Sequence, residues 1–174
     1  MGHDRLLPLR FEDIPALEPF DFACAATSFH WLDQAAALLK VKTLLKPDGL
    51  WAMWWNVFGD PREPDDFMKA SSPLFAKLAQ GPSQGTQMPF ALRTSERFSQ
   101  MESAGFHDMK YHEVNWTADM TVEEVVGLTA TFSPVARLDP IERGAFLSQI
   151  RALCTNMGPV IWRRFVTPIY TARA

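Results

Sequence analysis

Apolar residues along this chain follow two alternating periodicities. The run "FDFACAA" at Phe20–Ala26 is almost continuously apolar, which is typical of a strand covered on both faces. From Gln34 to Lys46 the apolar residues recur at the spacing of one helix face. The run "LWAMWWN" at Leu50–Asn56 is a second apolar strand. Since the joints are short, the pattern predicts a βαβ unit with parallel neighbouring strands and a right-handed crossover.

Residues with special local roles refine this unit. Asp33 is placed to cap the helix, and "KPDG" ends it, with Gly49 expected to take a positive φ. Cys24 lies inside the first apolar run, so we expect it to be a small buried hydrophobic residue.

The rest of the chain alternates helix signals with two further strands. Helices are predicted at 65–78 and 94–104, and strands at 106–116 and 161–172. Thr121 and Glu124 form a capping-box pattern, and Asp139 followed by Pro140 marks another helix start. We interpret residues 1–174 as one domain, with 57–93 and 117–157 as helical insertions or a cap.

Composition and charge exclude several classes of protein. An apolar fraction of 47% among 174 residues is sufficient for a packed core, which excludes a disordered chain. The net charge of -3 arises from scattered residues, so neither nucleic acid nor membrane is an expected partner. No stretch approaches the roughly 20 apolar residues that span a bilayer. Two cysteines without metal-type spacing predict no metal site and fit a reducing cytoplasm.

Several motifs, taken in order, resemble a known enzyme family. "FEDIP", "FDFACAATSFHWLD", "LLKPDGLWAMWWN" and "ESAGF" are similar to the middle and end of class I S-adenosylmethionine-dependent methyltransferases, most closely the branch acting on small molecules. The resemblance covers about residues 8–172. It implies an α/β, partial Rossmann-like fold whose mixed sheet has a C-terminal antiparallel hairpin and helices on both faces. The last strand would then lie antiparallel between the second and third.

The resemblance also implies where the reaction would take place. His30 and Trp31 follow the carboxyl end of a parallel strand, the edge at which such sheets bind ligands. They are therefore the candidate catalytic residues, with His30 a possible proton acceptor from a hydroxyl or amine. The alternative is an aromatic corner that packs the start of the helix.

Cofactor and substrate contacts are implied at other positions. Phe11 and Glu12, with Thr27 and Ser28, would contact S-adenosylmethionine. Arg10 departs from the family, which often has an acid there, and a solvated turn is the alternative for this stretch.

Two further positions are candidate substrate contacts. Asn56 ends the second apolar strand, and Arg163 lies in the terminal strand. Because Arg163 and Arg164 alternate in direction, we expect one of them to meet an acid and the other to be solvated.

One family feature is missing from this sequence. None of the nine glycines forms the G-x-G-x-G loop that approaches the methionine part of the cofactor in the family. The expectation is therefore a truncated methyltransferase-like chain that transfers a methyl group to an unidentified small molecule and binds S-adenosylmethionine weakly or not at all alone. The alternative is a non-catalytic, self-associating remnant of that fold. In either case we expect a homodimer through the Phe20–Ala26 edge or by exchange of the N-terminal segment.

Overall fold

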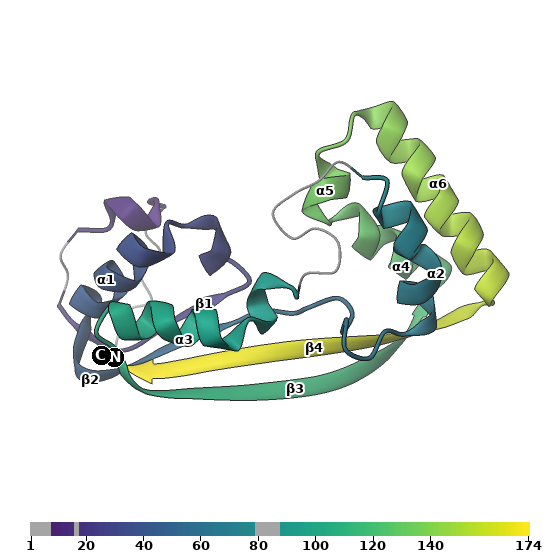
Figure 1. The fold of residues 1–174 in the computed structure, drawn as a ribbon. Coiled ribbons are helices and arrows are strands. Elements are labelled where there is room, and N and C mark those ends of the chain that lie inside the picture. The colour runs from purple at the N-terminus through teal and green to yellow at the C-terminus, as the bar shows by residue number, and fades with distance from the viewer. Residues whose placement is uncertain (1–7, 16–17, 79–87) are drawn as a thin grey trace, which may run out of the picture. The chain divides into compact units, whose positions relative to one another are not determined.

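The computed structural model describes residues 8–15, 18–78 and 88–174. Its four strands form one mixed sheet in the order β1-β2-β4-β3 (Figure 1). The strands are β1 (Phe20–Ala26), β2 (Leu45–Trp54), β3 (His107–Thr121) and β4 (Val160–Arg173). β1 runs parallel to β2, and β4 runs antiparallel to β2. The predicted order and directions of these strands are confirmed.

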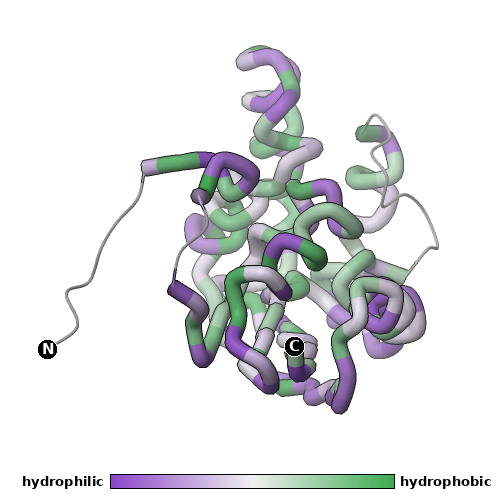
Figure 2. Tube along the Cα trace, turned by 90° about the vertical axis from the view of Figure 1, so that its left-hand side faces the viewer, coloured by the Kyte–Doolittle hydropathy of each residue, from purple (hydrophilic) through white to green (hydrophobic). Residues whose placement is uncertain are grey.

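Six α-helices and three short 3-10 helices accompany the strands in the described residues. The α-helices are α1 (Gln34–Leu44), α2 (Asp66–Phe75), α3 (Thr94–Ser103), α4 (Val122–Ala130), α5 (Ser133–Ala136) and α6 (Pro140–Met157). The 3-10 helices are η1 (Phe11–Asp13), η2 (Phe29–Trp31) and η3 (Phe90–Leu92). Along the chain, apolar and polar residues are interspersed within these elements (Figure 2).

The predicted helix starts are confirmed because their capping bonds are present. The Asp33 carboxylate accepts a hydrogen bond from the amide of Ala36 at 3.1 Å and so caps α1. At α4, Thr121 and Glu124 form the full capping box. The Asp139 carboxylate accepts hydrogen bonds from the amides of Ile141 and Glu142 and so caps α6.

The chain divides into two compact units. Unit 1 comprises Met1–Trp55, Arg93–His112 and Pro168–Ala174, and unit 2 comprises Asn56–Leu92 and Glu113–Thr167. The assignment of residues 57–93 and 117–157 as insertions on a single domain stays a prediction.

The core of unit 1 lies between α1, α3 and the sheet. Most of the helical stripe predicted for α1 is buried: Ala37, Leu38 and Val41 are at most 5% exposed, whereas Leu44 is half-buried. Gly105 follows the end of α3 with a φ of +82°, and its carbonyl accepts a hydrogen bond from the Lys42 ammonium. This hydrogen bond joins α1 to the end of α3.

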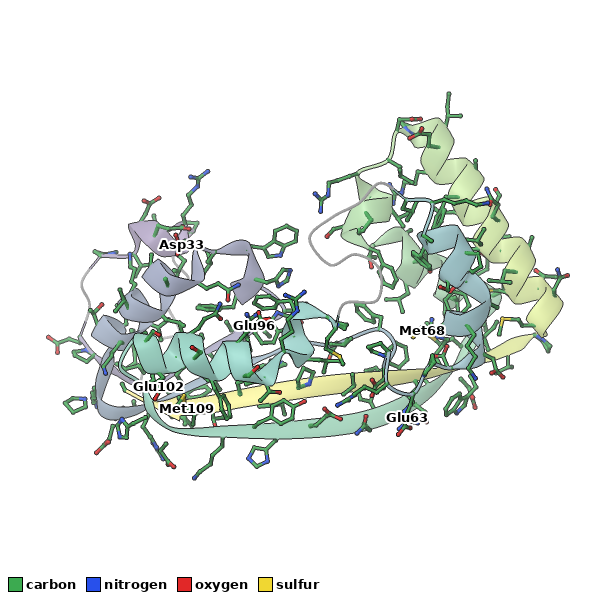
Figure 3. All side chains as sticks on the ribbon, viewed as in Figure 1. Asp33, Glu63, Met68, Glu96, Glu102 and Met109 are labelled. Carbon is green, nitrogen blue, oxygen red and sulfur yellow. The ribbon has the colours of Figure 1, made fainter. Side chains whose placement is uncertain are left out.

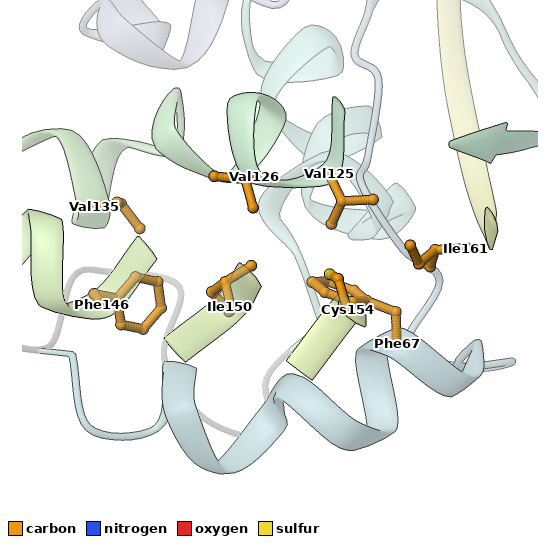
Figure 4. Packing of buried hydrophobic residues seen from close by; sticks show 8 residues of the cluster. All are labelled: Phe67, Val125, Val126, Val135, Phe146, Ile150, Cys154 and Ile161. Carbon is orange, nitrogen blue, oxygen red and sulfur yellow. The ribbon is translucent and has the colours of Figure 1, made fainter. Parts of the chain in front are cut away.

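Unit 2 has its own hydrophobic core. Side chains from α2, α4, α5, α6 and the start of β4 fill it (Figure 4). Its buried residues are Phe67, Val125, Val126, Val135, Phe146, Ile150, Cys154 and Ile161. No helix in the described part of the chain is long and apolar enough to cross a membrane.

Two sequence predictions about β1 and the turn before β2 are wrong. Cys24 is exposed and no residue of β1 is fully buried, so this strand is not covered on both faces. Gly49 does not take a positive φ; Asp48 does, at 62°. The "KPDG" residues belong to β2 instead of ending the helix, and the pairing of β1 with β2 shifts register between Phe20 and Phe22. Gly49 is buried, and a side chain at this position would clash with the carbonyl oxygen of Lys46.

Candidate active site at the carboxyl ends of the parallel strands

The ends of β1 and β2 are joined by a constrained turn in unit 1. The amide of Thr27 donates a hydrogen bond to the carbonyl of Trp54 at 2.8 Å. Thr27 has a φ of 49°, in the left-handed region that β-branched residues rarely occupy. Such backbone strain persists only where surrounding contacts impose it, and it is concentrated at functional sites.

Immediately after this turn, η2 is anchored by one aromatic residue and exposes the next two. Phe29 is 2% exposed, and its ring packs at a tilt against Trp51 with centroids 5.2 Å apart. His30 and Trp31 point outward, Trp31 being 66% exposed, and their rings lie 4.9 Å apart. Phe29 therefore packs this corner, whereas His30 and Trp31 are exposed, and a ligand contact of these two residues stays a prediction.

His30 is held by a hydrogen bond from β2's end. The indole Nε1 of Trp55 donates to Nδ1 of His30 at 3.0 Å. Since an indole N–H is only a donor, Nδ1 must be the unprotonated nitrogen, and the neutral ring carries its proton on Nε2. Burial lowers the pKa of His30 below its usual value, which also favours the neutral ring.

Trp55, the donor of this bond, is itself fixed in the core of unit 1. It is 4% exposed and meets the ring of Tyr170 edge-on at 6.1 Å. The Tyr170 hydroxyl lies 3.4 Å from the hydroxyl of Thr94, at the start of α3. The orientation of His30 is thus tied, through Trp55, to β4 and α3.

Phe11 and Glu12, predicted to contact the cofactor, lie in η1 against α1. Lys40 of α1 places its ammonium over the Phe11 ring, 5.7 Å from the centroid, and donates to the carbonyl of Glu12. Ser28 supplies the backbone carbonyl that accepts from the amide of Trp31, 3.0 Å away. Thr27 and Ser28 therefore lie beside His30, whereas Phe11 and Glu12 contact Lys40 of α1. Their assignment to the cofactor stays a prediction.

Asn56 and Arg163, the predicted substrate contacts, belong to unit 2. The Thr167 hydroxyl donates to Asn56 Oδ1 at 2.9 Å and accepts from the Trp116 indole at 3.0 Å. Arg163 Nε donates to Asp65 Oδ2 at 2.9 Å, and both side chains are at most 3% exposed. Substrate binding by either residue stays a prediction.

The side chains of Arg163 and Arg164 point to opposite faces of β4, as neighbouring residues of a strand do. Arg163 meets the buried Asp65, and its guanidinium lies over the Phe67 ring at 4.3 Å. Arg164 is partly exposed and pairs with Glu63 (Figure 3), an exposed acid. The expectation that one arginine meets an acid is confirmed by Arg163 and Asp65. The expectation that the other is solvated is wrong, because Arg164 pairs with Glu63.

Trp55 and Asp65 are the residues whose roles the sequence did not reveal. Trp55 is one of three tryptophans in the apolar run at Leu50–Asn56, and Asp65 stands at the start of a predicted helix, so neither position shows its partner in the sequence. The available signal for Trp55 was its place at the carboxyl end of a parallel strand, next to the edge assigned to His30. Asp65 carries no such signal, because its partner is distant in the sequence.

Two other features of the described residues bear on ligands. No group of three or more His, Cys, Asp or Glu side chains that could hold a metal ion occurs among them. A groove of about 610 Å³ lies between α1 and α3, and Glu96 (Figure 3) is one of the residues that line it. The other lining residues are Ala35, Leu39, Ser95, Ser99, Gln100, Ser103 and Ala104, so none of the predicted site residues lines it.

Comparison with known proteins supports the fold. No protein-family model and no curated protein sequence matches this chain. Among solved structures, a protein assigned as a methyltransferase from Bacillus halodurans C-125 matches with a TM-score of 0.51 and 15% identity, covering 94% of this chain and 68% of that one. A protein assigned as a type II methyltransferase from Anaeromyxobacter dehalogenans matches with a TM-score of 0.52 and 14% identity, covering 91% and 66%. The chain thus has a methyltransferase-like Rossmann fold and spans about two thirds of these structures.

Proposed function

We propose that this protein is methyltransferase-like and that it holds a small methyl acceptor against His30 and Trp31. The fold and the sequence motifs support the reaction class. The observation that carries the site is the hydrogen bond from Trp55 to His30 at the carboxyl ends of β1 and β2. Rossmann-like sheets bind their ligands at this edge.

His30 would act by positioning the acceptor. Because Nδ1 accepts from Trp55, Nε2 carries the proton of the neutral ring and can donate to an acceptor oxygen or nitrogen. The same bond makes His30 a poor general base, since taking up a second proton at Nδ1 would break it. The exposed Trp31 ring beside it offers an apolar face for the acceptor. Correct orientation alone contributes much of the rate of a transfer reaction.

S-adenosylmethionine would supply the methyl group as a sulfonium, and the residues of this chain fit it only in part. Thr27 and Ser28 lie at the strand end that we expect to border the cofactor. Thr27, however, has the positive φ that a glycine would adopt without strain. The sequence has no glycine-rich loop for the methionine end. Each missing charge-assisted hydrogen bond typically costs about 1.5–3 kcal/mol. Losing several would weaken micromolar binding to millimolar or beyond.

The test is a titration of the whole chain with S-adenosylhomocysteine, followed by NMR. The six tryptophans give separate indole N–H signals, and Trp31→Phe and Trp55→Phe identify two of them. We expect saturable shifts of the Trp31 and Trp55 signals with a millimolar dissociation constant, while the signal of Trp116 in unit 2 stays in place. Shifts absent up to the solubility limit would refute the proposal and favour the non-catalytic remnant. Micromolar binding seen by calorimetry would refute the expected weakness.

A further inference from the structure

The two outer strands of the sheet differ in how their edges are protected. β1 and β3 stand at opposite ends of the strand order. Edge strands normally avoid pairing with other chains through charges, prolines or irregularities. β3 carries many such residues: His107, Asp108, Lys110, His112, Glu113 and Asp119. β1 carries only Asp21, whose carboxylate is paired with Lys46 at 2.8 Å.

The unprotected edge of β1 is also apolar on one face. Phe20 is 46% exposed and Phe22 is 50% exposed. Cys24 and Ala26 are exposed on the same side of the strand, because side chains alternate along it. Among the described residues, β1 pairs only with β2, so its other edge has no partner strand. A half-exposed phenylalanine pair on an open edge is a template for a further strand.

The size of the side chains on this face selects the kind of partner. The two large residues, Phe20 and Phe22, occupy the first half of β1, and the small Cys24 and Ala26 occupy the second half. In an antiparallel twofold pair of β1 with its own copy, each phenylalanine faces a small residue. A parallel pair would place phenylalanine against phenylalanine. The strand is therefore complementary to itself in the antiparallel direction.

The backbone is compatible with the same pairing. The amide of Thr27 points toward β2, where it meets the Trp54 carbonyl. Backbone groups alternate in direction along a strand, so those of Phe20, Phe22, Cys24 and Ala26 point to the open edge. Opposing these residues across a twofold axis at Ala23 forms hydrogen-bonded pairs along the whole strand. In this register Phe20 faces Ala26 of the copy, and Phe22 faces Cys24.

We infer that β1 is an interface at which this chain pairs with a second copy of itself, antiparallel and centred on Ala23. The pairing extends the four-stranded sheet across the twofold axis and covers the exposed phenylalanine side chains. Asp21 does not oppose it, because Lys46 neutralises the carboxylate within the same chain. This interface is independent of the proposed methyltransferase function.

Light scattering with size-exclusion chromatography tests the oligomeric state. We expect the full chain to have twice its mass of 19.7 kDa. Phe22→Lys should raise the dimer dissociation constant at least tenfold, since it places two ammonium groups within the pair. Val114→Lys on β3 is the matched control, because Val114 is 49% exposed on the other edge strand, and it should leave the dimer intact. A wild-type monomer, or equal effects of the two variants, would overturn the inference.

Crosslinking through the cysteines gives a second test. It uses the wild-type protein, so it holds even if Phe22→Lys folds poorly. In the proposed register the two Cys24 residues are diagonal neighbours, about 7–8 Å apart between Cα atoms. This exceeds the comfortable span of a disulfide, but a short bismaleimide can bridge it. We expect covalent dimers from the wild-type protein and from Cys154→Ser, whose thiol is buried, and none from Cys24→Ser. A monomer whose Cys24 thiol resists maleimide would show instead that its own chain covers the edge, and would also overturn the inference.

Discussion

Removal of the Asp65 carboxylate should strongly destabilise unit 2. Asp65 Oδ2 accepts from Nε of Arg163 and from the amide of Arg164, each at 2.9 Å. Its Oδ1 accepts from the amide of Met68 at 2.7 Å, which caps α2 (Met68 in Figure 3). One carboxylate therefore joins the start of α2 to the first part of β4.

The expected magnitude follows from these contacts. Removing one partner of a buried ion pair costs about 3–5 kcal/mol, because the other charge is left buried without compensation. Loss of a helix cap adds about 1 kcal/mol. For Asp65→Ala the sum is a large part of the roughly 5–15 kcal/mol that stabilises a domain. Arg163→Met should cost less, since two backbone amides still donate to Asp65.

Urea denaturation gives the free energies, and hydrogen exchange read by mass spectrometry locates the loss. Exchange should accelerate in α2 and around Arg163. In the double variant Asp65→Ala/Arg163→Met the cost should be at least about 2 kcal/mol less than the sum of the single costs. Asp66→Ala is the control, because its side chain is 89% exposed, and it should change stability by no more than about 0.5 kcal/mol. The reasoning fails if Asp65→Ala costs under about 1 kcal/mol, or if the two single costs simply add.

Three further predictions concern local features. Thr27→Gly should relieve the strained φ and raise the free energy of unfolding, measured by thermal unfolding, by up to about 1 kcal/mol. Asp48→Gly should raise it less, because Asp tolerates the left-handed region better than Thr, and an equal gain would contradict the strain at Thr27. NMR titration should show a His30 pKa below its usual value. The neutral His30 ring therefore contributes stability above about pH 6.5, and this stability is lost as the pH falls below that value. Trp55→Phe should raise the His30 pKa, and an unchanged pKa would contradict the hydrogen bond to Nδ1. Thr121→Ala should cost about 1 kcal/mol through the capping box of α4, measured by urea denaturation, and no loss would show that the box is dispensable.

The features that the sequence predicted well depend on nearby residues. Asp33 and Thr121 each cap a helix through the amide three positions later, so their role is visible in the sequence alone. The parallel pairing of β1 and β2 follows from the short helix between them. The antiparallel position of β4 came from the resemblance to a family rather than from any local signal.

The features that could not be predicted depend on contacts between residues that are far apart in the sequence. The apolar run of β1 cannot show whether another element covers its second face, and that decided the exposure of Cys24. Asp65 and Arg163 are separated by 98 positions, and nothing in either neighbourhood identifies the other. His30 was recognised as a candidate, but its protonated nitrogen depends on Trp55, 25 positions away.

The pairing of β2 with β4 has a consequence for synthesis on the ribosome. β2 lies in the middle of the sheet, yet its antiparallel neighbour is made much later: the Arg173 guanidinium bonds to the carbonyl of Asp48, 125 positions earlier. While the intervening chain is translated, the side of β2 that faces β4 stays open, with Trp51 and Met53 on a strand that has only β1 beside it. Contacts of such long sequence separation form slowly, and unpaired apolar strands aggregate in the interval. Slow translation after residue 56 would therefore be expected to lower the soluble yield, and a holdase chaperone acting on the nascent chain would be expected to restore it.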